Sequence, residues 1–234
     1  MSSHADLKPI KLYGKGGPNP PKVEIILNEL GLPHEVIPVA WDDIKKPAYT
    51  AINPNGRVPA IQDPNTGLTL WESGAILEYL VTTYDKDHKI SFPAGTPEAW
   101  HAKQWLFFQT TGQAPYFGQA AWFVKFHPEK LPSAIDRYVN EIQRVQGVLE
   151  RVLNEQKEKY AAGTGKTGDG PWLVGNKVSY ADIAFVTWQN AIEAILGDKY
   201  SDENFPTFRE WLAKLRARPA VAEVTGSAGQ VKAK

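Results

Sequence analysis

Two kinds of apolar spacing alternate along the first 84 residues. Between Val23 and Leu30 the apolar residues recur at helical spacing, which predicts a helix over Pro20–Leu30 that ends before Gly31. The same reasoning predicts strands at 9–13, 35–39, 58–62 and 68–71 and further helices at 42–52 and 73–83. The order βαβαββα predicts an α/β domain with right-handed parallel crossovers first and a hairpin last.

From residue 97 onward the pattern is helical throughout. Helices are predicted at 97–127, 132–160, 179–196 and 204–217, followed by a short helix that begins at Pro219. The uncharged stretch 104–124 is about as long as a membrane span, but its glutamines, Gly112 and Pro115 favour a buried helix with a kink. With a linker at 84–97, we predict an α/β domain at 8–84 and an all-helical domain at 97–224.

Composition and charge narrow the class of protein. The 26 basic and 26 acidic residues give a net charge of zero, which argues against nucleic acid or an anionic membrane as a partner. The chain has no cysteine, so disulfides, thiolate metal sites and a cysteine nucleophile are excluded. The five histidines have no ligand spacing, so no metal is expected, and no secretory signal is evident. We expect a soluble, cytoplasmic protein in which any reacting thiol comes with the substrate.

The glycine-rich segment Gly163–Gly168 (GTGKTG) partly matches a phosphate-binding loop. That motif needs a glycine five residues before Gly165, where this chain has Tyr160, and a strand before the loop, where a helix is predicted. We therefore reject a nucleotide site and expect a flexible loop over 163–170.

Three local features carry the chemistry, and all lie at the same predicted end of the sheet. The first is the sequence NPNGRVP, which ends in Val58-Pro59 at the start of a strand. A cis proline here leaves the Val58 main-chain N–H and C=O exposed for pairing with an extended peptide. The alternative is a proline that merely ends a loop.

The second feature is Glu72-Ser73, directly before a predicted helix. A helix N-terminus with a serine hydroxyl and N–H can bind a carboxylate, and the adjacent glutamate can bind an ammonium. Together they match the zwitterionic head group of an α-amino acid. The alternative is an ordinary N-cap serine beside a solvated glutamate.

The third feature is Asn19, which lies among prolines at the start of the first predicted helix. Asn19 is expected to be the N-cap, with Pro20 as the first helical residue. The positive end of this helix also favours a thiolate, to which the asparagine amide can donate a hydrogen bond. Both roles are compatible, because a cap uses the side-chain oxygen and leaves the nitrogen available.

With these features the chain resembles a glutathione transferase from residue 8 to about residue 224. The motifs WESGAIL, LPSAIDRY, PWLVG and SYADIA, together with Asn19 in a Pro-Asn pair, resemble the fungal branch related to the nitrogen-catabolite regulator and to bacterial nu-type enzymes. The resemblance implies a thioredoxin-like first domain, an all-helical second domain and a homodimer. Ser179-x-x-Asp182 is a capping box that the family uses to fold a core helix, so Asp182 is expected to be structural.

The resemblance also implies how glutathione would lie. Its γ-glutamyl end would contact Glu72 and Ser73, and its cysteinyl backbone would pair with Val58. Its glycyl carboxylate would lie near Lys45, with Lys46 as the competing choice, and its sulfur near Asn19. The glutathione-binding residues expected on these grounds are Asn19, Lys45, Val58, Pro59, Glu72 and Ser73.

One departure from the family concerns activation of the thiol. Residues 14–22 contain no serine, tyrosine or cysteine, Gly17 stands where many relatives have a serine, and Tyr13 is one position early. Activation would then rest on Asn19, the expected catalytic residue, and on the helix N-terminus. Lowering a thiol pKa from about 8.5 by about 1.5 units corresponds to roughly 2 kcal/mol, which one charge-assisted hydrogen bond and a helix end can supply. No general base on the protein is required.

Aromatic residues cluster around Pro115, where the family has its second-substrate pocket. We expect Tyr116 and Phe123 to line a pocket for a small hydrophobic electrophile or peroxide, although an aromatic stripe at helical spacing is also typical of a helix core.

The resulting hypothesis is an enzyme in which the glutathione thiolate attacks hydrophobic electrophiles, as in detoxification, or reduces peroxides or disulfides. The alternative class is a non-enzymatic ligandin or regulator. The regulator carries a long Asn/Gln-rich arm, whereas only about eight residues precede the first predicted strand here, which disfavours that alternative. A transferase-like domain of a translation factor would be expected on a longer chain.

Overall fold

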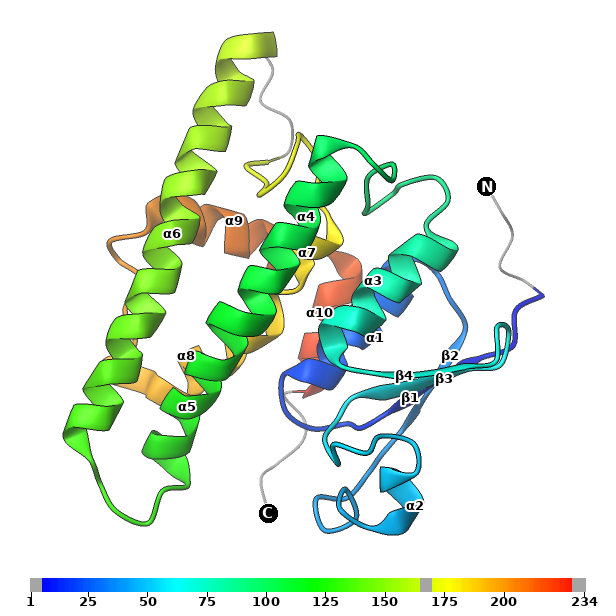
Figure 1. The fold of residues 1–234 in the computed structure, drawn as a ribbon. Coiled ribbons are helices and arrows are strands. Elements are labelled where there is room, and N and C mark those ends of the chain that lie inside the picture. Colours follow the sequence, from blue (N-terminus) through cyan, green and yellow to red (C-terminus); the bar gives the residue numbers. More distant parts are fainter. Residues whose placement is uncertain (1–5, 165–169, 229–234) are drawn as a thin grey trace. The chain divides into compact units, whose positions relative to one another are not determined.

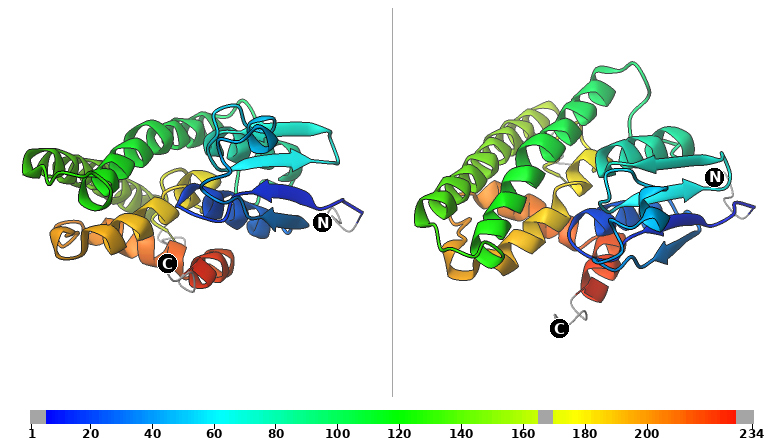
Figure 2. Two further views of the ribbon diagram at one scale, coloured as in Figure 1. Left: turned by 90° about the horizontal axis from the view of Figure 1, so that it is seen from below. Right: turned by 60° about the horizontal axis from the view of Figure 1, so that its bottom comes forward.

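The structure, a computed structural model, describes residues 6–164 and 170–228. It divides into two compact units, one formed by Met1–Ser91 with Pro219–Lys234 and the other by Phe92–Arg218. Figures 1 and 2 show the chain from three directions. The loop predicted over 163–170 falls largely on residues 165–169, which lie outside the described residues.

The first unit has the predicted βαβαββα order. Its elements are β1 (Ile10–Tyr13), α1 (Asn19–Glu29), β2 (His34–Ile37), α2 (Pro47–Thr50), β3 (Ala60–Asp63), β4 (Leu68–Trp71), α3 (Ser73–Tyr84) and α10 (Pro219–Ala228). The sheet order is β2-β1-β3-β4, with β1 parallel to β2 and the other two pairings antiparallel. Helices α1 and α3 cover one face of the sheet and α2 lies at the other (Figure 1). The apolar sides of strands and helices meet in a core that includes Leu12, Ile26, Ile61 and Leu77, all fully buried.

The strand register brings three chain segments to one edge of this sheet. Tyr13 at the end of β1 pairs with Ala60 at the start of β3, and Ala60 in turn pairs with Trp71 at the end of β4. The loop before α1, the Val58-Pro59 segment and the start of α3 therefore leave the sheet side by side. The predicted convergence of the three features is confirmed.

Two predicted elements of this unit are shorter than expected. The helix predicted over 42–52 is reduced to α2, because residues 41–46 are mostly exposed and offer no apolar face to pack. Strand β3 begins at Ala60 rather than at Val58, since Pro59 has no N–H to donate to a ladder.

The second unit is entirely helical within its described residues. Its elements are α4 (Pro97–Phe108), the π-helical turn η1 (Gln109–Gln113), α5 (Ala114–Lys125), α6 (Pro132–Thr164), α7 (Tyr180–Ile183), α8 (Val186–Leu196), the 3₁₀ turn η2 (Gly197–Lys199) and α9 (Pro206–Arg216). Its core contains the large buried rings of Phe117, Phe185, Phe208 and Trp211. In the described part of the chain, no helix combines the length and apolarity needed to cross a membrane.

The uncharged stretch 104–124 contains the predicted irregularity. The π turn joins α4 to α5 just before Pro115. Gln109 Nε2 donates to Gln113 Oε1 at 2.9 Å, and Gln113 Nε2 donates to the Phe185 carbonyl at 3.1 Å. Both glutamines are fully buried, so these bonds satisfy polar groups that would otherwise destabilise the core. The predicted helix is present and a π turn interrupts it, but it is only partly buried, since Phe107 and Trp122 are exposed.

Asp182 organises the chain around α7. The capping box with Ser179 is present, and Asp182 also accepts hydrogen bonds from the Leu173 N–H at 2.8 Å and the Trp211 indole at 2.9 Å. Burial raises the pKa of this carboxyl, and the hydrogen bonds oppose that shift. Because its oxygens are bound to groups of the core, these contacts support a structural role.

The last helix differs from the predicted domain boundary. The helical domain was expected to extend to residue 224, but α10 belongs to the first unit and packs against α1. Val221 and Val224 of α10 are buried. Apolar periodicity showed that this segment is a helix, but it carries no information about which partner buries its apolar face.

Candidate functional site

Gly14 sets the path of the chain at the end of β1. Its φ angle is +108°, and a Cβ added there would lie 2.6 Å from the Val58 Cβ. Only glycine combines this backbone angle with so close an approach. Gly14 therefore lets the loop that leads to α1 pass directly beside Val58.

The Val58-Pro59 peptide bond is cis, which is one of the two possibilities that the sequence left open. The carbonyl of the preceding residue, Arg57, accepts hydrogen bonds from the Tyr49 hydroxyl at 2.7 Å and the Asn53 amide at 2.6 Å. Val58 lies outside β3, and the backbone hydrogen bonds found among the described residues do not involve its N–H or C=O. These two groups can therefore pair with the backbone of an extended ligand.

The two lysines near this segment have different partners. Lys45 Nζ donates to the Asn55 carbonyl at 2.8 Å, and its side chain lies against Gly56, in the turn that leads to Val58. Lys46 instead forms an exposed ion pair with Asp43 at 2.6 Å. Lys45 therefore lies against the turn that precedes Val58, whereas Lys46 is paired with Asp43.

Helix α3 begins at Ser73, and Glu72 is its N-cap residue. The alternative of an N-cap serine is therefore wrong. Glu72 has φ +71°, a left-handed conformation that costs a non-glycine residue about 1–3 kcal/mol and is concentrated at functional sites. Its side chain is exposed, whereas Ser73 is buried at the first position of the helix.

Lys22 of α1 lies next to this serine. It is fully buried, and its Nζ donates to the Ser73 Oγ at 3.1 Å. Burial lowers the pKa of Lys22 to about 7, although the Glu72 carboxylate partly offsets the effect. The sequence analysis did not include Lys22 in the predicted site. On α1 it lies on the same side as Ile25, Ile26 and Glu29, all of which are buried. A lysine on the apolar side of a helix is the signal that could have identified it.

The start of α1 differs slightly from the prediction. Asn19 is the first helical residue and Pro18 is the cap, so the expected N-cap role of Asn19 is wrong. Asn19 is half-buried at the positive end of the helix. The Tyr13 hydroxyl donates to Gln62 Oε1 at 2.7 Å, on the neighbouring strand β3.

A second residue outside the predicted set is Trp41. Its side chain is 66% exposed, and a Cβ added at Gly16 would lie 3.4 Å from its ring. The indole therefore lies along the backbone of the loop that leads to Asn19. Its exposed apolar ring thus forms part of the surface beside the start of α1.

Tyr116 and Phe123 both belong to α5 and pack on α6. The Phe123 ring stacks on Tyr138 with centroids 5.6 Å apart, and the Tyr116 ring lies 6.3 Å from the same tyrosine. Both side chains remain partly exposed. The two rings thus contribute to the packing of α5 on α6.

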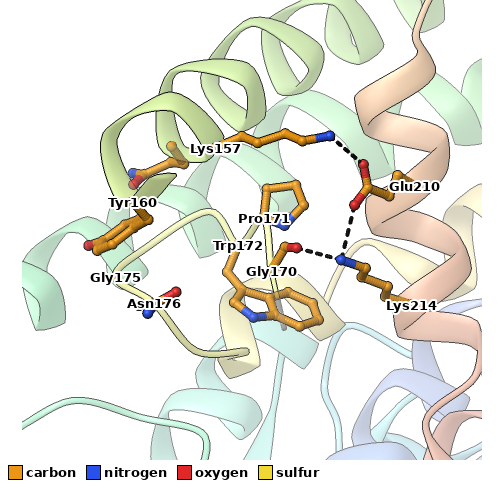
Figure 3. Close-up of a pocket in the computed structure, with 10 residues that line it drawn as sticks. Lys157, Tyr160, Gly170, Pro171, Trp172, Gly175, Asn176, Glu210 and Lys214 are labelled. Carbon is orange, nitrogen blue, oxygen red and sulfur yellow. Dashed lines mark hydrogen bonds and ion pairs between the residues drawn. The ribbon is translucent and has the colours of Figure 1, made fainter. Parts of the chain in front are cut away.

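A separate small cavity lies between α6, α9 and the segment 170–176 (Figure 3). Its volume is about 120 Å³, well below the roughly 300 Å³ at which ligand pockets begin. Glu210 joins Lys157 at 2.7 Å and Lys214 at 3.0 Å across its rim. None of the predicted site residues lines it. Within residues 6–164 and 170–228, no group of three His, Asp or Glu side chains could hold a metal ion.

Comparison with known proteins agrees with this arrangement. The family model for the glutathione S-transferase N-terminal domain matches residues 17–83, and that for the C-terminal domain matches residues 114–219. The glutathione S-transferase-like protein tpcF of Aspergillus fumigatus is 60% identical over 92% of this chain and 94% of its own length. Glutathione S-transferase 1 of Schizosaccharomyces pombe is 41% identical over 87% of this chain and 89% of its own.

Solved structures are similar along nearly the whole chain. The glutathione transferase URE2P6 of Phanerochaete chrysosporium, in complex with oxidized glutathione, has a TM-score of 0.85 and 45% identity over 96% of this chain and 98% of its own. Ure2p in complex with glutathione has a TM-score of 0.83 and 36% identity over 93% of this chain and 99% of its own. The chain belongs to the glutathione transferase family, on its Ure2p-like branch.

Proposed function

We propose that this protein is a glutathione transferase whose bound glutathione thiolate attacks hydrophobic electrophiles. The observation that carries the proposal is the meeting of the α1 start, Val58 and Glu72-Ser73 at one edge of the sheet, which the register of β1, β3 and β4 dictates. This edge offers a carboxylate site, an ammonium site and an exposed peptide group in one row. A tripeptide with a free amino acid head group has the matching groups.

The proposed ligand contacts follow this row. The γ-glutamyl carboxylate binds the N-terminus of α3 at Ser73, and the γ-glutamyl ammonium binds Glu72. The cysteinyl backbone pairs with Val58, whose N–H and C=O lie outside the strand ladder of β3. The glycyl carboxylate lies at Lys45, which the Asn55 carbonyl holds beside the same turn.

The thiol would lie at the start of α1, near Asn19. The fixed bond from the Tyr13 hydroxyl to Gln62 supports the view that tyrosine does not activate it. The helix N-terminus and the Asn19 amide then favour the thiolate, which requires about 2 kcal/mol to lower its pKa by about 1.5 units. The thiolate is the nucleophile, and its proton passes to solvent on binding.

For the second substrate we propose an apolar site formed by Tyr116 and Phe123. A relative, Ure2p5 of P. chrysosporium, was cocrystallized with 1-(S-glutathionyl)-2,4-dinitrobenzene, a conjugate of glutathione with an aromatic electrophile. This supports conjugation as the leading reaction. Disulfide or peroxide reduction is the second candidate, favoured by complexes of other relatives with oxidized glutathione. Family membership supports a homodimer, which sedimentation at several concentrations would test.

The decisive experiment is a titration with glutathione followed by the ultraviolet difference signal of the thiolate across pH. Saturable binding with a depressed thiol pKa is expected, and a screen of aromatic electrophiles and peroxides then identifies the reaction. Binding without a pKa shift would point to a ligandin or regulator instead. If glutathione does not bind, the proposal is wrong.

A further inference from the structure

We propose that Lys22 is a positioning residue of the glutathione site, whose ammonium fixes the Ser73 hydroxyl and supplies the buried positive charge for the γ-glutamyl carboxylate. The inference rests on the proposed function and extends it to a residue outside the predicted site. Lys22 lies in the first turn of α1, the helix that begins at Asn19. One helix therefore serves both ends of the ligand, the thiol at its start and the head group one turn later.

The hydrogen bond between the two side chains determines how Ser73 can act. A serine hydroxyl has one O–H donor and two acceptor lone pairs. Because the Lys22 ammonium donates to the Ser73 Oγ, one lone pair is occupied and the hydroxyl hydrogen must point elsewhere. Lys22 thus leaves the Ser73 O–H for an acceptor at the N-terminus of α3, where the ligand carboxylate is proposed to bind.

The burial of Lys22 makes its charge depend on the ligand. A fully buried ammonium is unfavourable unless an anion lies nearby. Glu72 is exposed, and its carboxylate offsets only part of the effect of burial. A ligand carboxylate at Ser73 adds a further negative charge and favours the charged lysine. Binding of the head group and protonation of Lys22 therefore promote each other.

Several other charged residues lie on α1 and on the elements that pack against it. Helix α1 packs against β1, α3 and α10. The charged residues on these elements are Lys11 on β1, Glu24 and Glu29 on α1 itself, Glu72 and Glu78 at α3, and Glu223 on α10. Of these, Glu72 raises the pKa of Lys22, whereas Glu223 acts on Glu24. The tyrosine hydroxyls of β1 and α3 bind Gln62 and Asp63.

The first test measures protons taken up when the wild-type protein binds S-methylglutathione. This analogue keeps the head group but has no free thiol, so thiol ionisation does not contribute. Calorimetric titrations in buffers of different ionisation enthalpy should show uptake of a substantial fraction of a proton near pH 8 and almost none near pH 6. Affinity should fall by up to about tenfold per pH unit as the pH rises above the pKa of Lys22. Absence of uptake at both pH values would overturn the proposal.

The second test uses variants, with Lys86→Met as the matched control. Lys86 is an exposed lysine of the same unit that donates to the Thr82 carbonyl. At about pH 6.5, Lys22→Met should weaken S-methylglutathione binding about tenfold or more, and near pH 8 it should abolish the proton uptake, whereas Lys86→Met should match the wild type at both pH values. Lys22→Arg should restore part of the affinity without restoring the pH dependence. Equal affinity in Lys22→Met and Lys86→Met would contradict the proposal.

A double-mutant cycle of Lys22 and Ser73 distinguishes a role of Lys22 in positioning the Ser73 hydroxyl from a general effect of Lys22 on the stability of the fold. If Lys22 acts through the hydroxyl, Lys22→Met should weaken binding much less in a Ser73→Ala background than in the wild type. Full additivity would reject that route. Should Lys22→Met fail to fold by circular dichroism, the wild-type proton uptake decides the question.

The outcomes also separate this inference from the proposed function. If the wild type binds neither glutathione nor S-methylglutathione, the proposed function is wrong and Lys22 has no such ligand to position. If it binds both without proton uptake and Lys22→Met is unaffected, the transferase proposal stands and the role of Lys22 is rejected.

Discussion

At the scale of single residues, the head-group contacts give the first prediction. Ser73→Ala and Glu72→Gln should each weaken glutathione binding about tenfold or more, because a hydrogen bond to a charged group contributes about 1.5–3 kcal/mol. Titration calorimetry at constant pH measures the change. The exposed Glu35 of β2 offers a matched control, since Glu35→Gln alters the same side-chain type on a strand that contributes none of the three segments of the proposed site. Unchanged affinity in both site variants would discard the head-group assignment.

Asn19 gives a prediction that separates binding from chemistry. Asn19→Ala should change the glutathione Kd by less than about threefold, because the rest of the tripeptide binds elsewhere. It should raise the thiol pKa by about one unit, since a hydrogen bond that stabilises the thiolate by about 1.4 kcal/mol is lost. Turnover should therefore fall most below pH 7 and recover in alkali. A pH profile identical to the wild type would remove Asn19 from the mechanism.

The residues that could be predicted are those whose chemistry is visible in local sequence. Glu72, Ser73 and Val58 stand next to recognisable helix starts and prolines, and the structure brings all three to one edge. Lys22 and Trp41 are absent from the predicted set, because their contacts near the site are with residues distant in sequence. Lys22 contacts a residue 51 positions away, and the exposed Trp41 lies against a loop about 25 residues earlier in the chain.

At the scale of elements, the path from β1 to α1 depends on one glycine. Gly14→Ala should destabilise the fold and weaken glutathione binding, because the new Cβ would overlap Val58. The matched control is Gly67→Ala. Gly67 also has a positive φ of +75°, but a Cβ there has no heavy atom within 4 Å, so that variant should lose only about 1–2 kcal/mol and keep its affinity.

Urea unfolding and calorimetry on both glycine variants check this prediction. Equal stability losses, or normal affinity in Gly14→Ala, would show that the contact with Val58 does not position the site.

The sequence predicted the order of the helices and strands more accurately than the residues at which they begin and end. All seven predicted elements of the first unit are present, since apolar periodicity is a local property. The expected N-cap of α1 was one residue off, since Pro18 is the cap and Asn19 the first helical residue, whereas α3 begins at Ser73 as predicted, with Glu72 as its cap. Propensity favours asparagine and serine as caps, but here each lies within the helix, and Ser73 is bound by Lys22 from another helix.

At the scale of the whole molecule, buried Lys22 should make stability depend on pH. Its pKa of about 7 in the folded state is below that of an unfolded lysine, about 10.4, so between these values the unfolded state binds more protons. The free energy of unfolding should therefore rise with pH from about 7 to 9.5, by at most about 1.4 kcal/mol per unit. Lys22→Met should lack this component.

Urea unfolding of both proteins at several pH values, compared as a difference, isolates the contribution of Lys22. Below about pH 7 the lysine is charged in both states and the difference should level off. Parallel stability curves for the wild type and Lys22→Met would contradict a depressed lysine pKa.

The sequence by itself determined the class of most elements and their order, and it located the polar groups from which the binding site is proposed. These properties depend on residue type and short spacing, which the chain displays directly. Only the tertiary structure decided the pairing of Tyr13 with Ala60 and Ala60 with Trp71, the bond from Lys22 to Ser73, and the packing of α10 on α1. Each joins segments far apart in sequence, so the hydrogen bond or apolar contact that it contributes exists only once the chain has folded.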